Sequence, residues 1–240
     1  MTLREFWWRA GGKLIYPVVP RSRRLPVTYW LNLFGGFVEP ELRCLEKFCP
    51  NRDIAIDVGV HVGLFSYRLS RLFRKVYAFE INDELLDDLR AYNSGNVEII
   101  GTGLSSIAGE TIFYIPVEKN FPLTGWGSLA PNNYPQADSH LTKVVRVRPL
   151  DSFSIQNVSF IKIDVEGHEV DVLRGALNTI STNQPVILVE VKEHNRENVS
   201  SFFRDLGYVE TSLERICGIL GSAENRIFLP HELQQTKPES

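Results

Sequence analysis

From residue 51 onward, short apolar runs alternate with segments whose apolar residues recur every three or four positions. Apolar runs bounded by turn residues are typical of buried strands, and the three-to-four spacing is typical of helices. This alternation predicts an α/β fold with a doubly wound, mostly parallel sheet. The strands are expected at 54–58, 75–80, 96–101, 160–165, 185–191 and 225–229, and the helices at 64 to about 72, 83–93, 168–177 and 200–208.

Two further predicted strands, "ETIFYIP" and "KVVRVRPL", interrupt the alternation between residues 101 and 160. They predict a β-rich insertion in the α/β domain. Residues 1–50 precede the alternation and are expected to form an N-terminal helical cap. The predicted organisation is therefore a cap segment at 1–50 and a main domain at 51–240.

Each of four predicted strands has an acidic residue at its carboxyl end: Asp57, Glu80, Asp164 and Glu190. Ligands of doubly wound sheets bind at the carboxyl ends of the strands. These acids are therefore the first candidates for a functional site.

The turn after the first strand narrows the choice of ligand. It has the pattern D-x-G-x-x-x-G, with Asp57, Gly59 and Gly63, and Glu80 follows 23 residues after Asp57. An acid at that place can accept both hydroxyls of a ribose. Val60 stands where a nicotinamide-binding loop would have its second glycine, which disfavours an NAD-dependent oxidoreductase. A nucleoside that carries a cation and no pyrophosphate, such as S-adenosylmethionine, fits better, although the glycines alone also fit a purely structural turn.

Several stretches then resemble one known family. The stretches "DVGVHVGLFS", "VYAFEIN", "GLSS", "PLDSF", "FIKIDVEGHEVDVLRGA" and "ILVEVKEHN" are similar to the FkbM family of S-adenosylmethionine-dependent methyltransferases over roughly residues 51–210. The resemblance implies a class I methyltransferase fold, with a seven-stranded sheet whose last strand runs antiparallel. It also implies O-methylation of a hydroxyl on a sugar, a glycan or a polyketide-like acceptor. Val60-His61 departs from the Ala-Asn that the family often has in the first loop.

The resemblance also assigns cofactor-binding residues, position by position. The glycine loop is expected to hold the methionine part of the cofactor, Glu80 the ribose, and Ile81, Asn82 and Leu104 the surroundings of the adenine. For His61 and Ser128, a local turn hydrogen bond is an equal alternative. The predicted cofactor-binding residues are Asp57, Gly59, His61, Gly63, Ser66, Glu80, Ile81, Leu104, Ser105, Ser128 and Asp164.

The acceptor hydroxyl is a weak acid, so it needs a base or a metal ion as it attacks. The stretch "DVEGHE" offers the candidate catalytic residues His168, Asp164 and Glu166. We expect His168 to be the base, because an unperturbed histidine accepts protons near neutral pH, and Asp164 to orient it or hold the acceptor. The alternative is a magnesium or manganese ion, since oxygen ligands with an imidazole suit these ions. Its predicted ligands are Asp164, Glu166, Glu190 and His194.

The distribution of charge limits the partners. The net charge is −3, but residues 1–30 carry six basic residues and one acid, which leaves −8 for the remainder. The basic segment also holds Trp7, Trp8 and Trp30, so peripheral contact with a membrane surface is an alternative to a simple packed cap. We expect the cap to cover the ligand site at the strand ends, on the side where the methyl acceptor binds.

The acidic main domain disfavours a nucleic-acid methyltransferase. The many polar residues at the strand ends disfavour a module that binds the cofactor without catalysing a reaction. The sequence has no apolar run long enough to span a membrane. Its three cysteines are an odd number and are expected to be reduced thiols, which predicts a cytoplasmic protein.

Overall fold

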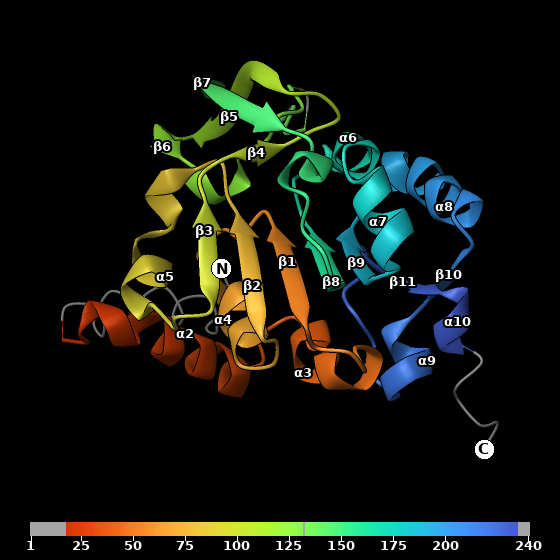
Figure 1. Ribbon diagram of the computed structural model, residues 1–240. Helices are drawn as coiled ribbons and strands as arrows, with labels where there is room; N and C mark the ends of the chain where they lie inside the picture. The colour runs from red at the N-terminus through yellow and green to blue at the C-terminus, as the bar shows by residue number, and fades with distance from the viewer. Residues whose placement is uncertain (1–17, 132, 235–240) are drawn as a thin grey trace.

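The computed structural model describes residues 18–131 and 133–234, and its centre is a seven-stranded sheet (Figure 1). The strand order is β3-β2-β1-β8-β9-β11-β10, in which β11 runs antiparallel to both neighbours and the other pairs are parallel. This confirms the predicted fold class, including the antiparallel last strand. The strands are β1 (Ile54–Val58), β2 (Lys75–Phe79), β3 (Val97–Ile100), β8 (Val158–Ile163), β9 (Val186–Glu190), β10 (Tyr208–Thr211) and β11 (Asn225–Pro230).

The central strands are buried along their whole length because helices cover both faces of the sheet. Every residue of β1 and of β8 is buried. One core contains the helices α2 (Arg21–Gly35), α3 (Pro40–Phe48), α4 (Leu64–Ser70), α5 (Asp87–Tyr92) and α9 (Leu213–Cys217). The core on the other face contains α6 (Glu169–Arg174), α7 (Leu177–Asn183) and α8 (Arg196–Asp205), while the short α10 (His231–Gln234) follows β11.

The predicted insertion forms a second sheet. Figure 1 shows it beyond the carboxyl ends of β1, β2 and β3. Its strands, in the order β4-β7-β5-β6, are β4 (Gly103–Leu104), β5 (Gly109–Glu118), β6 (Phe121–Pro122) and β7 (Ser139–Arg148). The remaining elements are the short 3-10 helices η1 (Asp83–Leu85), η2 (Thr124–Trp126), η3 (Leu150–Phe153) and η4 (Glu193–Asn195). The insertion therefore stands above the edge of the sheet at which ligands bind.

The strand order reverses between β1 and β8. The chain first proceeds outward from β1 through β2 to β3, and later returns to place β8 on the other side of β1. In open α/β sheets such a reversal opens a crevice at the carboxyl edge. The loops after β1, β2 and β8 meet at that crevice, and they carry most of the predicted site residues.

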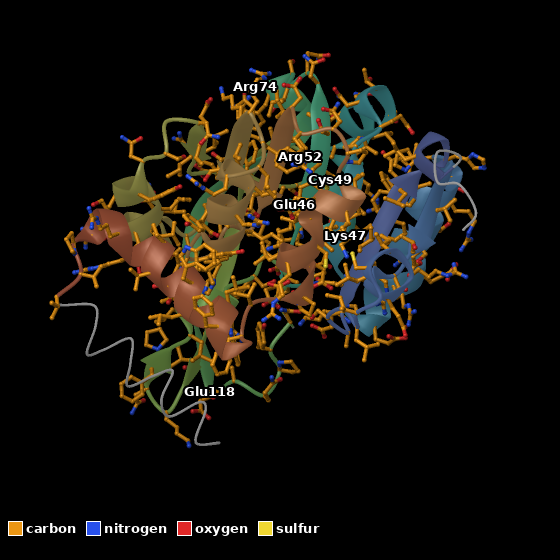
Figure 2. All side chains as sticks on the ribbon, turned by 90° about the horizontal axis from the view of Figure 1, so that it is seen from below. Glu46, Lys47, Cys49, Arg52, Arg74 and Glu118 are labelled. Atoms are coloured by element: carbon orange, nitrogen blue, oxygen red, sulfur yellow. The ribbon has the colours of Figure 1, made fainter. Side chains whose placement is uncertain are left out.

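The described part of the N-terminal segment is helical and packs on the face of the sheet. Leu25 and Tyr29 of α2 and Leu45 of α3 are buried in the same core as α4 and α5. In Figure 2, the labelled Arg74 and Glu118 of the insertion lie toward opposite edges of the view, and Glu46 and Lys47 of α3 lie between them. Neither α2 nor α3 lines the cavity described below, and the cover over the acceptor side that the sequence predicts for residues 1–50 stays a prediction.

Trp30 is 49% exposed on α2. Trp7 and Trp8 lie outside the described residues, so their predicted role stays a prediction, as does the domain boundary at residue 50. Among the described residues, no helix combines the length and the apolar character that crossing a bilayer requires.

Candidate functional site

The turn after β1 is shaped by two residues that only glycine fills easily. Gly59 and Gly63 both have positive φ angles, of 80° and 90°. A Cβ on Gly59 would also overlap the backbone oxygen of Asp164, so the turn after β1 and the turn after β8 are pressed together. His61, also at positive φ, points its backbone N–H at Glu80. The glycine spacing in the sequence thus reflects the close approach of two strand-end loops.

Glu80 follows β2 and lies at the floor of the crevice. Its Oε2 accepts the His61 N–H at 2.8 Å, and its Oε1 accepts the Asn82 N–H at 2.7 Å. Burial raises the pKa of Glu80, and the backbone hydrogen bonds from Asn82 and His61 oppose this shift. Each carboxylate oxygen has two lone pairs, so both oxygens keep the capacity to accept a ligand hydroxyl.

Glu80 borders a cavity of about 230 Å³ at the carboxyl ends of β1, β2 and β8. Seven of the predicted cofactor-binding residues line it: Gly59, His61, Glu80, Ile81, Leu104, Ser128 and Asp164. Apolar side chains, among them Phe79 and Leu85, complete the wall around Glu80.

This set of donors and walls fits S-adenosylmethionine. The buried carboxylate of Glu80 can accept hydrogen bonds from ribose hydroxyls, and the apolar walls suit an adenine ring. The cavity also reaches Asp164 and Glu166, whose negative charge suits the positively charged sulfonium group. These residues would therefore hold the cofactor that the sequence predicts.

The other four predicted cofactor-binding residues lie outside the cavity lining. Asp57 is fully buried behind the glycine turn, where it accepts the Ser66 hydroxyl at 2.6 Å. Gly63 caps α4 and faces Leu89, and Ser105 faces His168. The side chain of Asp57 points to the opposite face of the sheet from Val58, away from the cavity. The glycine loop is therefore supported on its far side by Asp57, Ser66 and Gly63.

Lys162 links the buried charges beneath the site. Its Nζ lies 2.9 Å from Asp164 Oδ2. Burial alone would lower the pKa of Lys162, but the charges of Asp164, Asp57 and Glu39 outweigh burial and raise it. Lys162 is therefore a cation that holds Asp164 in place.

Three of the four predicted metal ligands converge. Oxygens of Asp164, Glu166 and Glu190 lie within 4.8 Å of one another at the ends of β8 and β9, whereas His194 is exposed and is not part of this group. Burial, together with the charge of Asp164, raises the pKa of Glu190 to about 8. The chain also brings its own cation to the group, because Lys192 Nζ lies 3.5 Å from Glu166 and 3.7 Å from Glu190.

His168 occupies a different position from the one expected of a base. Its Nε2 is 3.0 Å from Ser105 Oγ, its Nδ1 is 3.7 Å from Asp171 Oδ2, and the ring does not line the cavity. Burial lowers the pKa of His168. His168 is the residue before α6, and the start of that helix turns its ring toward the loop after β4. Asp164 and Glu166, and not His168, border the cavity.

A segment of the insertion roofs the cavity. Its Thr124 carbonyl accepts the Asn82 side-chain amide at 3.1 Å, and Ser128 Oγ donates to the Glu166 carbonyl at 2.5 Å. The Tyr134 hydroxyl donates to Glu166 Oε2 at 2.7 Å. Residues 124–131 and 133–134, which we call the roof segment, thus tie the loop after β2 to the loop after β8.

The sequence did not single out three side chains of this region: Trp126, Tyr134 and Lys192. Trp126 lines the cavity and stacks on Tyr134, with ring centroids 5.4 Å apart. They lie in the insertion or after β9, where no spacing rule links them to the glycine loop. The one available signal was the cluster of aromatic residues and glycines in "GWGSLAPNNY", which is typical of a ligand-binding loop.

Comparison with known proteins places these features in a family. Residues 57–210 match the model described as the methyltransferase FkbM domain. A curated relative, the hexuronic acid methyltransferase AglP of Haloferax volcanii, is 28% identical over 150 residues, which are 61% of this chain and 59% of the relative. The crystal structure of methyltransferase FkbM from Methylobacillus flagellatus has a TM-score of 0.51 and 17% identity, over 74% of this chain and 43% of that one. The chain thus matches less than two thirds of the length of either protein.

Proposed function

Because this chain belongs to the FkbM family of S-adenosylmethionine-dependent methyltransferases, we propose that it methylates a hydroxyl group of a sugar or glycan. One observation carries the proposal: a single cavity is lined both by the buried Glu80, which we assign to the ribose, and by the carboxylates Asp164 and Glu166. The curated hexuronic acid methyltransferase supports a sugar as the class of acceptor.

The roles of the residues follow from their positions. The cofactor supplies an electrophilic methyl group, so the chain itself has to position the acceptor and take its proton. Asp164 borders the cavity, and Lys162 fixes one of its carboxylate oxygens. The other oxygen is available to accept a hydrogen bond from the acceptor hydroxyl. The acceptor hydroxyl becomes more acidic as its oxygen donates electron density to the methyl carbon during the attack. The carboxylate of Asp164 can therefore take the hydroxyl proton at that stage.

Asp164 replaces His168 in this proposal as the proton acceptor, since His168 is engaged with Ser105 outside the cavity. A divalent cation remains the alternative way to activate the hydroxyl. Asp164, Glu166 and Glu190 would hold it, and it would lower the pKa of the hydroxyl directly. The nearby Lys192 favours the metal-free form, because it already neutralises part of the carboxylate charge.

Transfer of a labelled methyl group tests the proposal. The full chain is incubated with methyl-labelled S-adenosylmethionine and, separately, with neutral and acidic sugars, RNA and a polyketide alcohol. The expected product is a methyl ether of a sugar, identified by mass spectrometry and by the site of the label. Transfer to RNA or to the polyketide alone would contradict the proposed acceptor class. Chelation followed by added magnesium or manganese decides between the two modes of activation.

A further inference from the structure

A pair of stacked aromatic rings stands beside the catalytic carboxylates. Trp126 and Tyr134 are nearly parallel, with an angle of 17° between their planes. Tyr134 is anchored by its hydrogen bond to Glu166, and Trp126 lines the cavity while 47% of it stays exposed. An exposed indole held in place by a stacked partner offers a rigid surface at little entropic cost. The face of an aromatic ring is electronegative, so it suits the C–H face of a pyranose ring.

The charges around this platform are predominantly negative. Three carboxylates, those of Asp164, Glu166 and Glu224, are joined by the two cations Lys162 and Lys192, and Glu190, whose pKa burial raises to about 8, lies beside them. Both lysines already have protein partners, since Lys162 contacts Asp164 and Lys192 lies 3.0 Å from Glu224 and within 3.7 Å of two further carboxylates. The chain's own acids thus outnumber and occupy the cations of this charged cluster.

An acceptor with its own carboxylate would meet this excess of negative charge, and both lysines of the charged cluster are already paired. Like charges a few ångströms apart repel each other strongly where water is partly excluded. A hydroxyl-bearing sugar without a charge avoids that cost and still gains the contact with Trp126. The platform and the charged cluster therefore favour the same kind of acceptor.

We infer that the acceptor of this protein is an uncharged sugar whose ring packs on Trp126, and that the charged cluster rejects a uronic acid at the same position. This inference rests on the proposed function and narrows it. It also separates this chain from the hexuronic acid methyltransferase to which it is similar.

Matched pairs of acceptors test the inference. Each pair consists of a methyl hexoside and the corresponding hexuronoside, in the gluco, galacto and manno series, so that the members differ only at carbon 6. We expect kcat/KM for the best neutral sugar to exceed that of its uronic partner by about tenfold or more, as expected for a difference of roughly 1.4 kcal/mol. Equal or better use of the uronic acid would overturn the inference and leave the proposed function standing. Transfer to no sugar at all would overturn both.

Variants of Trp126 test whether this residue binds the neutral sugar. Trp126→Ala should raise KM for the neutral sugar about tenfold or more, Trp126→Phe should restore most of it, and the affinity for S-adenosylhomocysteine should be unchanged. A matched loss of S-adenosylhomocysteine affinity would make Trp126 a wall of the cofactor site and overturn the inference.

Glu224→Gln should reduce the preference for the neutral sugar by about two- to fivefold, in the range of partly exposed charge pairs. The exposed Glu193, which pairs with Arg196, provides the control, and Glu193→Gln should leave the preference unchanged. An unchanged preference in Glu224→Gln would contradict the role of the charged cluster.

Discussion

The carboxylate of Glu80 is buried, and two backbone N–H groups converge on it. Its removal takes away the proposed ribose acceptor and also leaves those donors unpaired. We predict that Glu80→Ala weakens binding of S-adenosylhomocysteine by about 10- to 100-fold, corresponding to the loss of a charged hydrogen-bond partner worth about 1.5–3 kcal/mol. Isothermal titration calorimetry measures this, with Glu84→Ala as the control, because Glu84 is exposed and pairs with Lys143. Unchanged affinity in Glu80→Ala would remove Glu80 from the ribose site.

Asp164 and His168 differ in their access to the cavity, and their variants should differ in the same way. Asp164→Asn should lower kcat by about 10²- to 10⁴-fold, the usual contribution of a general base. His168→Gln should lower kcat by less than about tenfold, because the ring faces Ser105 and not the cavity. Single-turnover methyl transfer gives the rate for both variants. The affinity for S-adenosylhomocysteine shows whether the cofactor site of each variant is still correctly folded. The reverse order of effects would return the role of the base to His168.

At this scale the sequence located Glu80 and the strand-end acids, because their spacing follows from the order of the strands. It did not reveal that the His168 ring faces Ser105 and not the cavity, because the direction of the ring depends on how the loop after β8 turns into α6. It could not reveal Lys192 as a partner of Glu166, since two loops that are distant in sequence have to meet before that contact exists.

At the scale of elements, the contact between the turns after β1 and β8 depends on Gly59. A side chain there would have to adopt a φ of 80° and would overlap the Asp164 carbonyl. We predict that Gly59→Ala lowers the free energy of unfolding by at least about 2 kcal/mol, because backbone strain and displacement of the loop combine. Chemical denaturation measures the loss. Gly109→Ala is the control, since a Cβ added at Gly109 would meet nothing within 4 Å, and equal stability of the two variants would show that the turns can separate freely.

The elements themselves were largely predictable. Apolar runs such as "VILV" indicated the buried strands, and the two long strands of the insertion were visible in "ETIFYIP" and "KVVRVRPL". The roof segment was not predictable, because its path is fixed by single hydrogen bonds from Asn82 and Ser128 and not by a periodic pattern.

For the whole molecule, the N-terminal helices belong to the core of the sheet. Leu45 of α3 is fully buried, whereas Leu31 of α2 is 50% exposed. We predict that Leu45→Ala lowers the free energy of unfolding by about 2–5 kcal/mol, the usual loss when a large core side chain leaves a cavity, and that Leu31→Ala changes it by less than about 0.5 kcal/mol. Thermal and urea denaturation compare the two variants. Similar, small losses would mean that α3 is only loosely attached.

The position of these helices could not be taken from the sequence. Glu41 of α3 accepts the backbone N–H of Ser222, and Glu39 accepts the side-chain amide of Asn225. These contacts join the start of α3 to the segment just before β11 and to the first residue of β11. Spacing along the sequence predicts helices but not which distant element they meet, so the packing of α2 and α3 on the sheet was not predictable.

The catalytic and cofactor-binding roles proposed above all depend on the proposal that one cavity binds the cofactor between Glu80 and Asp164. A crystal structure of the full chain with S-adenosylhomocysteine tests this most directly, because it requires no knowledge of the acceptor. We predict both ribose hydroxyls within hydrogen-bond distance of the Glu80 carboxylate and the sulfur atom on the side of Asp164. Ribose bound elsewhere, or a sulfur atom directed away from Asp164, would contradict the proposed site.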